Sequence, residues 1–152
     1  MVELLSYDED TAFTLMDDAA TVSAIVRRVP AERLAATRFG DWTGIDLIGH
    51  VTDVAEVFAE RVRRALEEVA PHLEAIPEGM TGDPHREPMD LSRRLLRAHQ
   101  QIVALMQVPG AGERPAIHSD WGRVTAAHLA GYQARHSHEH SLELSKEFPP
   151  AA

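Results

Sequence analysis

Two histidines spaced four residues apart are the feature of this sequence with the clearest chemical potential. His136 and His140 lie in the stretch GYQARHSHEHSLEL, residues 131–144. On a helix this spacing places both rings on one face, one turn apart, where they can ligate the same ion. His138 is rotated from both by about 200°, at roughly 100° per residue, so we expect it to be exposed. An ordinary polar helix face shows the same spacing, so the pair alone does not establish a metal site.

A third ligand has to come from elsewhere in the chain, because a catalytic zinc site usually has three protein ligands and one open position. The sequence contains no cysteine, which leaves His, Asp and Glu as ligands. His50 is the candidate, since it lies beside the apolar stripe of a helix expected over residues 44–70. Asp53, three residues later, could accept a hydrogen bond from a ligand ring or act as a general base. A solvated surface carboxylate is the simpler interpretation of Asp53. Other nearby carboxylates are Glu56, Glu139 and Glu143.

The remaining histidines and the two tryptophans carry weaker signals. His128 falls in the first turn of the last expected helix, where packing or a hydrogen bond explains it better than ligation. Trp42 and Trp121 each precede a helix and are expected to anchor the core, with a substrate contact as the alternative. The other histidines have no partner at ligand spacing and are expected in loops or on the surface: His72, His85, His99 and His118.

Apolar residues recur at alternating spacings of four and three along several segments, which is typical of helices that bury one face. Ser6 with Glu9 predicts a capping box for the first helix, Thr43 with Asp46 predicts one for the second, and Thr125 is the expected N-cap of the last. Alternation typical of a strand is absent over a strand's length. The sequence therefore predicts an all-α four-helix bundle. The expected helices cover residues 8–29, 44–70, 89–107 and Thr125 to about Lys146, with a short helix in PAERLAA.

Residues 71–88 form a long connection, because four prolines and two glycines leave no regular element there. This connection decides whether the histidines meet. His50 and His140 lie at similar depth only if the second and fourth helices are antiparallel. In a simple up-down-up-down bundle they are parallel, and the levels differ by about 9 Å at 1.5 Å per residue. A crossover through residues 71–88, giving an up-down-down-up order, brings the levels together.

Bulk composition excludes several classes of protein. The 152 residues are 44% hydrophobic and 26% charged, which predicts one globular domain over residues 1–152. A net charge of -9 argues against nucleic acid as a partner. The acidic start MVELLSYDEDTAF is unlike a signal peptide, and no apolar run approaches the roughly 18 residues of a membrane span. We therefore expect a cytoplasmic protein without a membrane partner, and the lack of cysteine fits a reducing compartment.

Two segments, DWTGIDLIGHVTDV and VTAAHLAGYQARHSHEHSLEL, resemble the DinB/YfiT-like superfamily of bacterial metal-binding four-helix bundles. That superfamily includes thiol-dependent transferases and the mycothiol-dependent maleylpyruvate isomerase. The resemblance covers nearly the whole chain: a tryptophan before the second helix, a histidine within it, and HxxxH in the fourth. It implies an up-down-down-up bundle, a homodimer, and a divalent ion, zinc or nickel, held by His50, His136 and His140.

One position departs from the pattern of the superfamily. Members commonly carry a further histidine in the run H-x-x-x-H-x-x-x-H of the last helix, where this chain retains His128 but has Tyr132 in the middle. Tyr132 could line the pocket and donate a hydrogen bond there, or it could serve packing. We take Tyr132 and Asp53 as the candidate catalytic residues.

Three neutral imidazoles leave a divalent ion its full charge and an open site, which suits it to lower the pKa of a bound water or thiol. Because the chain has no cysteine, a thiol has to come from a small cofactor such as mycothiol or bacillithiol. The leading hypothesis is a low-molecular-weight-thiol-dependent S-transferase or isomerase acting on a small molecule. A metal-dependent hydrolase is the second hypothesis, and a non-catalytic bundle that binds a metal or ligand is the third.

Overall fold

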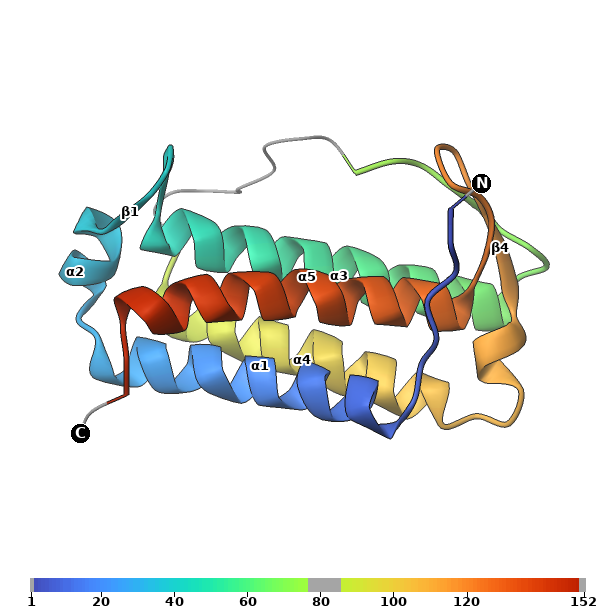
Figure 1. The fold of residues 1–152 in the computed structure, drawn as a ribbon, viewed down its shortest axis with the longest axis horizontal. Coiled ribbons are helices and arrows are strands. Elements are labelled where there is room, and N and C mark those ends of the chain that lie inside the picture. The colour runs from blue at the N-terminus through green and yellow to red at the C-terminus, as the bar shows by residue number, and fades with distance from the viewer. Residues whose placement is uncertain (1, 77–85, 151–152) are drawn as a thin grey trace.

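Four long helices make up most of the molecule and lie side by side (Figure 1). The computed structural model describes residues 2–76 and 86–150. A short helix, α2, follows the first long one. Within the described residues, none of the helices is both long and apolar enough to cross a bilayer. The helices are α1 (Glu9–Arg28), α2 (Ala31–Ala36), α3 (Gly44–Glu67), α4 (Pro88–Met106) and α5 (Ala126–Glu147).

The helix ends confirm two of the predicted caps and correct the third. The Thr43 side chain accepts from the backbone N–H of Asp46, which bonds back, so the capping box of α3 is as predicted. Thr125 likewise caps α5. The first helix is capped by Asp8 and Thr11 instead of Ser6 and Glu9. Both choices place an oxygen-bearing side chain near the helix start, and the chain path decides which one reaches the free N–H groups.

The predicted helix over residues 44–70 is too long at its C-terminal end. Helix α3 ends at Glu67, and Val69 is 95% exposed beyond it. Ala70 has a φ of 42°, a left-handed conformation in which a helix cannot continue. Val69 therefore extended the apolar periodicity by coincidence and takes no part in the core.

Short strands correct the expectation of a purely helical protein, so the molecule is mostly helical with two small sheets. The segments are only two to four residues long, too short for alternation to be visible in the sequence. Strand β3 lies inside the stretch 71–88, where no regular element was expected. Strands β1 and β2 pair antiparallel at one end of the bundle, and at the other end β4 pairs antiparallel with β5 and parallel with β3 (Figure 1). The strands are Arg38–Phe39, Trp42–Thr43, His72–Leu73, Pro115–His118 and Gly122–Thr125, numbered β1 to β5.

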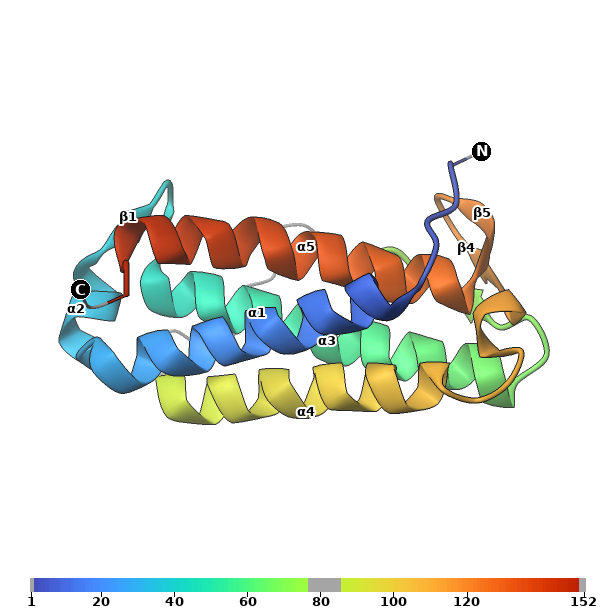
Figure 2. The same ribbon diagram turned by 60° about the horizontal axis from the view of Figure 1, so that its bottom comes forward.

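Contacts between helices give their relative directions. The Thr52 hydroxyl donates to the Leu91 carbonyl, and the next turn of α3 pairs with the next turn of α4 through Glu56 and Arg94, so these two helices run parallel. Phe58 of α3 stacks on Tyr132 of α5, whereas the earlier His50 meets the later His136, so α3 and α5 are antiparallel. The colour gradients agree: α3 and α4 advance toward one end, α1 and α5 toward the other (Figures 1 and 2). Much of the predicted crossover, residues 77–85, lies outside the described residues.

The core lies between the four long helices and contains polar groups as well as apolar ones. Leu15, Phe58, Leu95 and Leu129 are among its fully buried side chains. His99 of α4 is also completely buried, which corrects the expectation of a loop or surface role. Its Nδ1 lies 2.5 Å from the Leu15 carbonyl oxygen, which accepts a hydrogen bond from the ring N–H.

Candidate metal centre

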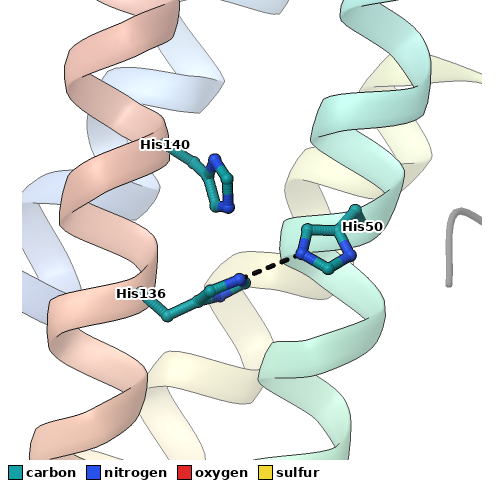
Figure 3. A group of neighbouring side chains, drawn as sticks. All are labelled: His50, His136 and His140. Atoms are coloured by element: carbon teal, nitrogen blue, oxygen red, sulfur yellow. Dashed lines mark hydrogen bonds between the residues drawn. The ribbon is translucent and has the colours of Figure 1, made fainter. Parts of the chain in front are cut away.

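Three histidines from two helices converge in the space between α3 and α5 (Figure 3). His50 projects from α3, and His136 and His140 project from successive turns of α5. One ligating nitrogen of each lies within 4.8 Å of those of the other two. The Nε2 atoms of His50 and His136 are 3.0 Å apart. The antiparallel course of the two helices therefore brings the three predicted residues to the same depth.

The donor set of this cluster fits a divalent transition metal. Burial, together with the neighbouring His140 and His50, lowers the pKa of His136 to about 3, so its ring is neutral at physiological pH. A neutral imidazole offers a lone pair to an ion. Two nitrogens bound tetrahedrally to one zinc lie about 3.3 Å apart, given zinc to nitrogen distances of 2.0–2.1 Å. The ligating nitrogens lie no more than 4.8 Å from one another, so small side-chain rotations are enough to bring them to that value.

A carboxylate orients one of the three rings. Nδ1 of His140 lies 2.9 Å from Oε1 of Glu143, one turn along α5. Because a carboxylate accepts, the His140 proton resides on Nδ1 and the lone pair on Nε2 is directed away from Glu143. Histidines that ligate metals commonly donate their other ring nitrogen to a carboxylate in this way. Glu143 thus takes the supporting position that the sequence left open among several nearby carboxylates.

A cavity of about 310 Å³ adjoins the histidines. It runs along α3 from His50 past Val54 and Phe58 to Arg61, and α5 contributes Tyr132 and His136. The Tyr132 ring stacks on Phe58 with centroids 5.2 Å apart, and its hydroxyl forms no hydrogen bond to another described residue. Tyr132 therefore both lines the cavity and packs on Phe58, and its catalytic role stays a prediction. The remaining lining residues are Ala75, Ile76, His118, Asp120 and Trp121.

Asp53 does not belong to this cavity. Its two carboxylate oxygens each lie 2.7 Å from a guanidinium nitrogen of Arg86, and Arg94 approaches to 3.5 Å. The Asp53 side chain is 11% exposed and is held in these ion pairs, so it is not a freely solvated surface carboxylate. Both oxygens face the guanidinium of Arg86. Asp53 therefore links α3 to Arg86 and to Arg94 of α4 through ion pairs. Its catalytic role stays a prediction without geometric support.

Two residues of the cavity were missed or misjudged from the sequence. His118 was expected in a loop or on the surface, yet it is buried on β4 and lines the cavity. Arg61 was not singled out, although it continues the stripe 50, 54, 58 on one face of α3. That spacing of four, four and three was a signal that could have identified it. His118 sits on a strand too short to be recognised, so no comparable signal existed for it.

The aromatic residues and the other histidines complete the comparison with expectation. Trp42 and Trp121 both pack partly buried against the core, as predicted. Trp42 also contacts the His50 ring, with centroids 4.6 Å apart, and Trp121 lines the cavity. His128 is buried and accepts a hydrogen bond from the Leu5 backbone, also as predicted. His138 and His72 are exposed, as expected, and His85 lies outside the described residues.

Comparisons with known proteins cover the same segments. A family model described as the DinB superfamily matches residues 15–144. A search of the curated proteins finds no match. Among solved structures, the chain is similar to YfiT from Bacillus subtilis, which is reported as a probable metal-dependent hydrolase with an unusual four-helix bundle topology. The two superimpose with a TM-score of 0.79 at 20% sequence identity, over 99% of this chain and 95% of that chain. At this level of identity the likeness shows a shared four-helix bundle fold.

Proposed function

The chain belongs to the DinB superfamily, and from this membership and the three-histidine cluster we propose that it is a metal-dependent enzyme acting on a small molecule. The observation that carries the proposal is the convergence of His50, His136 and His140 beside a cavity. Zinc is the proposed ion, and nickel is the second candidate, because imidazole suits both. When bound, the ion would supply Lewis-acid chemistry that lowers the pKa of an adjacent water or thiol.

The protein's own residues have distinct roles in this proposal. The three histidines hold the ion, and Glu143 fixes the orientation of His140 through its Nδ1 proton. The hydroxyl of Tyr132 faces the substrate and donates a hydrogen bond to it. Trp42 packs against the His50 ring and supports its position.

The nucleophile has to come from outside the chain. There is no cysteine in the sequence to act as a protein thiol. We propose a low-molecular-weight thiol such as mycothiol or bacillithiol as the nucleophile, which makes the protein an S-transferase or isomerase. Water is the second candidate, favoured by the fold shared with YfiT, reported as a probable metal-dependent hydrolase. A homodimer and a cytoplasmic location stay predictions from the sequence.

Elemental analysis of untagged protein tests the metal. We expect about one equivalent of zinc or nickel in the wild type and little in His50→Ala or His136→Ala. His138→Ala, which removes an exposed imidazole from the same helix, is the matched control and should retain the metal. A wild type without metal, or one that keeps it after loss of His50, would remove the basis of the proposal.

Turnover with and without thiol then separates the two nucleophiles. Zinc-loaded protein is incubated with a chromogenic aryl halide and bacillithiol or mycothiol, and in parallel with a chromogenic aryl ester alone. Adduct formation that requires the thiol and disappears in His136→Ala supports the transferase. Ester hydrolysis that is indifferent to added thiol and equally dependent on His136 supports the hydrolase.

A further inference from the structure

Arg61 is a buried cation that forms no ion pair with the described residues, and the carboxylate of the exposed Glu74 acts on it only from a distance. Its side chain is 8% exposed, and its guanidinium donates one hydrogen bond, to the Glu74 carbonyl oxygen. Its Cζ lies 5.5 Å from the centroid of the Phe58 ring, a cation–π contact. A guanidinium has five N–H donors. Burying its charge without an adjacent opposite charge is costly in free energy. The neighbouring Arg63, by contrast, pairs with Glu60 and Glu67 at the surface.

The guanidinium of Arg61 lies at the cavity that begins at the histidine cluster. His50 and Arg61 lie on the same face of α3 and both line the cavity. Eleven residues separate them, which corresponds to about 16 Å along the axis at 1.5 Å per residue. The cavity therefore has a histidine end and a cationic end, with the rings of Phe58 and Tyr132 between them.

A second donor lies in the wall of the same cavity. Nδ1 of His118 accepts from the backbone N–H groups of Asp120 at 3.1 Å and of Trp121 at 3.2 Å. Burial and the charge of Arg61 lower the pKa of His118, so the neutral ring carries its proton on Nε2. Nε2 has no hydrogen-bond partner among the described residues. Trp121 stacks on His118 with centroids 4.1 Å apart and an angle of 14°, which extends the aromatic surface.

We propose that the cavity takes a small molecule with a carboxylate at one end and a flat apolar body, and that Arg61 with the Nε2–H of His118 binds the carboxylate. The apolar body lies against Phe58, Tyr132 and Trp121, and the other end reaches His50. Only the assignment of the reacting end rests on the proposed function. Asp120, exposed at the cavity, repels anions and favours a carboxylate seated deep beside Arg61 over one held at the entrance.

Calorimetry with matched acids and amides tests this inference. The 152-residue chain as purified is titrated with phenylpropionate and phenylbutyrate, and with the corresponding primary amides, which have the same shape but no charge. We expect the acids to bind at least roughly tenfold more tightly than the amides, as for a hydrogen bond between charged groups. Arg61→Gln should abolish this preference. Arg63→Gln, the loss of a surface guanidinium two residues away, should leave it unchanged.

Several results would overturn the inference. Equal binding of acid and amide by the wild type, no detectable binding of any acid, or an unchanged preference in Arg61→Gln each contradict it. If Arg61→Gln does not fold, the preference for acid over amide is measured in Arg61→Lys, which keeps the charge, and in the wild type. These two measurements still decide whether the inference stands. His140→Ala separates the inference from the metal, because His140 does not line the cavity. If metal-free His140→Ala still prefers the acids, the inference stands without the metal. If the metal-loaded wild type does not prefer the acids, the inference is overturned and the proposed metal function is unaffected.

Discussion

The bundle contains two groups of histidines, which differ in the partners of their ring nitrogens. The ligand group is His50, His136 and His140, and the buried group is represented by His99. His99 uses both: Nδ1 bonds the Leu15 carbonyl oxygen, and Nε2 lies 3.0 Å from the amide nitrogen of Gln133. His136 directs Nε2 at another imidazole, and its Nδ1 is buried without a partner in the described part of the chain. Protein groups complete the first arrangement, whereas they leave the second incomplete. Burial of a histidine therefore indicates a ligand site only when its lone pairs converge with others.

The two groups meet neighbouring stripes of helix α5. Positions 132, 136 and 140 carry the cavity and the ligand rings, and positions 133, 137 and 141 carry the buried polar network. In that network Asp18 of α1 accepts from the hydroxyl groups of Ser137 at 2.7 Å and Ser141 at 3.0 Å, and His138 lies 3.1 Å away. Adjacent stripes of one helix thus serve stability on one side and ligand binding on the other. Substitutions that affect only one stripe test this division.

The largest expected effect on stability comes from Asp18→Ala. It leaves two buried serine hydroxyls without their acceptor, and hydrogen bonds to a buried carboxylate are strong, so we expect a loss of about 3 kcal/mol in the free energy of unfolding. Urea denaturation of metal-free protein measures this. The control is Asp17→Ala, an exposed neighbour on the same helix, which should change stability by less than about 0.5 kcal/mol. Equal losses in both variants would mean that the network contributes nothing.

The stability that zinc adds should depend on the ligand group and not on the buried group. At a free zinc concentration about 100 times the dissociation constant, binding to the folded state adds about 2.7 kcal/mol. His136→Ala should lose this increment, while His99→Gln should start from a lower baseline and keep it in full. Thermal melting of each variant with zinc and with EDTA gives the comparison. A zinc increment that survives in His136→Ala would mean that the metal binds elsewhere.

The ligand group was predictable from the sequence because each of its members sits on a long periodic helix. A spacing of four fixes the face that His136 and His140 share, and helix direction alone then decides whether His50 reaches them. The buried group was not predicted, although His99 stands four residues after Leu95 and one after Ala98, beside the buried stripe of α4. Its burial depends on a carbonyl and an amide from other helices, and no local pattern shows such partners. The strands are too short for periodicity to act on, so the sheets at the bundle ends and His118 were missed with them.

The pH dependence of stability should report His99. Burial lowers the pKa of His99 below its ordinary value of 6.5. The folded state therefore keeps the ring neutral, whereas the unfolded chain takes up a proton as the pH falls below about 6.5. The contribution to stability is complete above that pH and is lost on acidification toward the folded-state pKa, by up to about 2 kcal/mol between pH 6.5 and 5.

Denaturation of wild type and His99→Gln across this pH range, both in EDTA, measures the His99 contribution. Glutamine can donate to the Leu15 carbonyl but does not titrate, so the variant should lose less stability on acidification than the wild type. His72→Gln, at an exposed position, should reproduce the wild-type slope. Identical slopes in wild type and His99→Gln would show that His99 stays neutral in both states or charged in both.

The smallest effect is expected from Glu143→Gln, which keeps the shape and an acceptor oxygen but removes the charge that orients His140. Loss of such a supporting carboxylate typically weakens metal affinity by about tenfold, or about 1.4 kcal/mol. Because Glu143 is largely exposed, metal-free stability should be unchanged, which distinguishes a supporting role from a structural one. Zinc affinity by competition with a chromogenic chelator measures the effect, with Glu139→Gln as the control for one negative charge on the same helix. A loss that is equal in both variants would assign the effect to the general charge of α5 and would leave His140 positioned by packing alone.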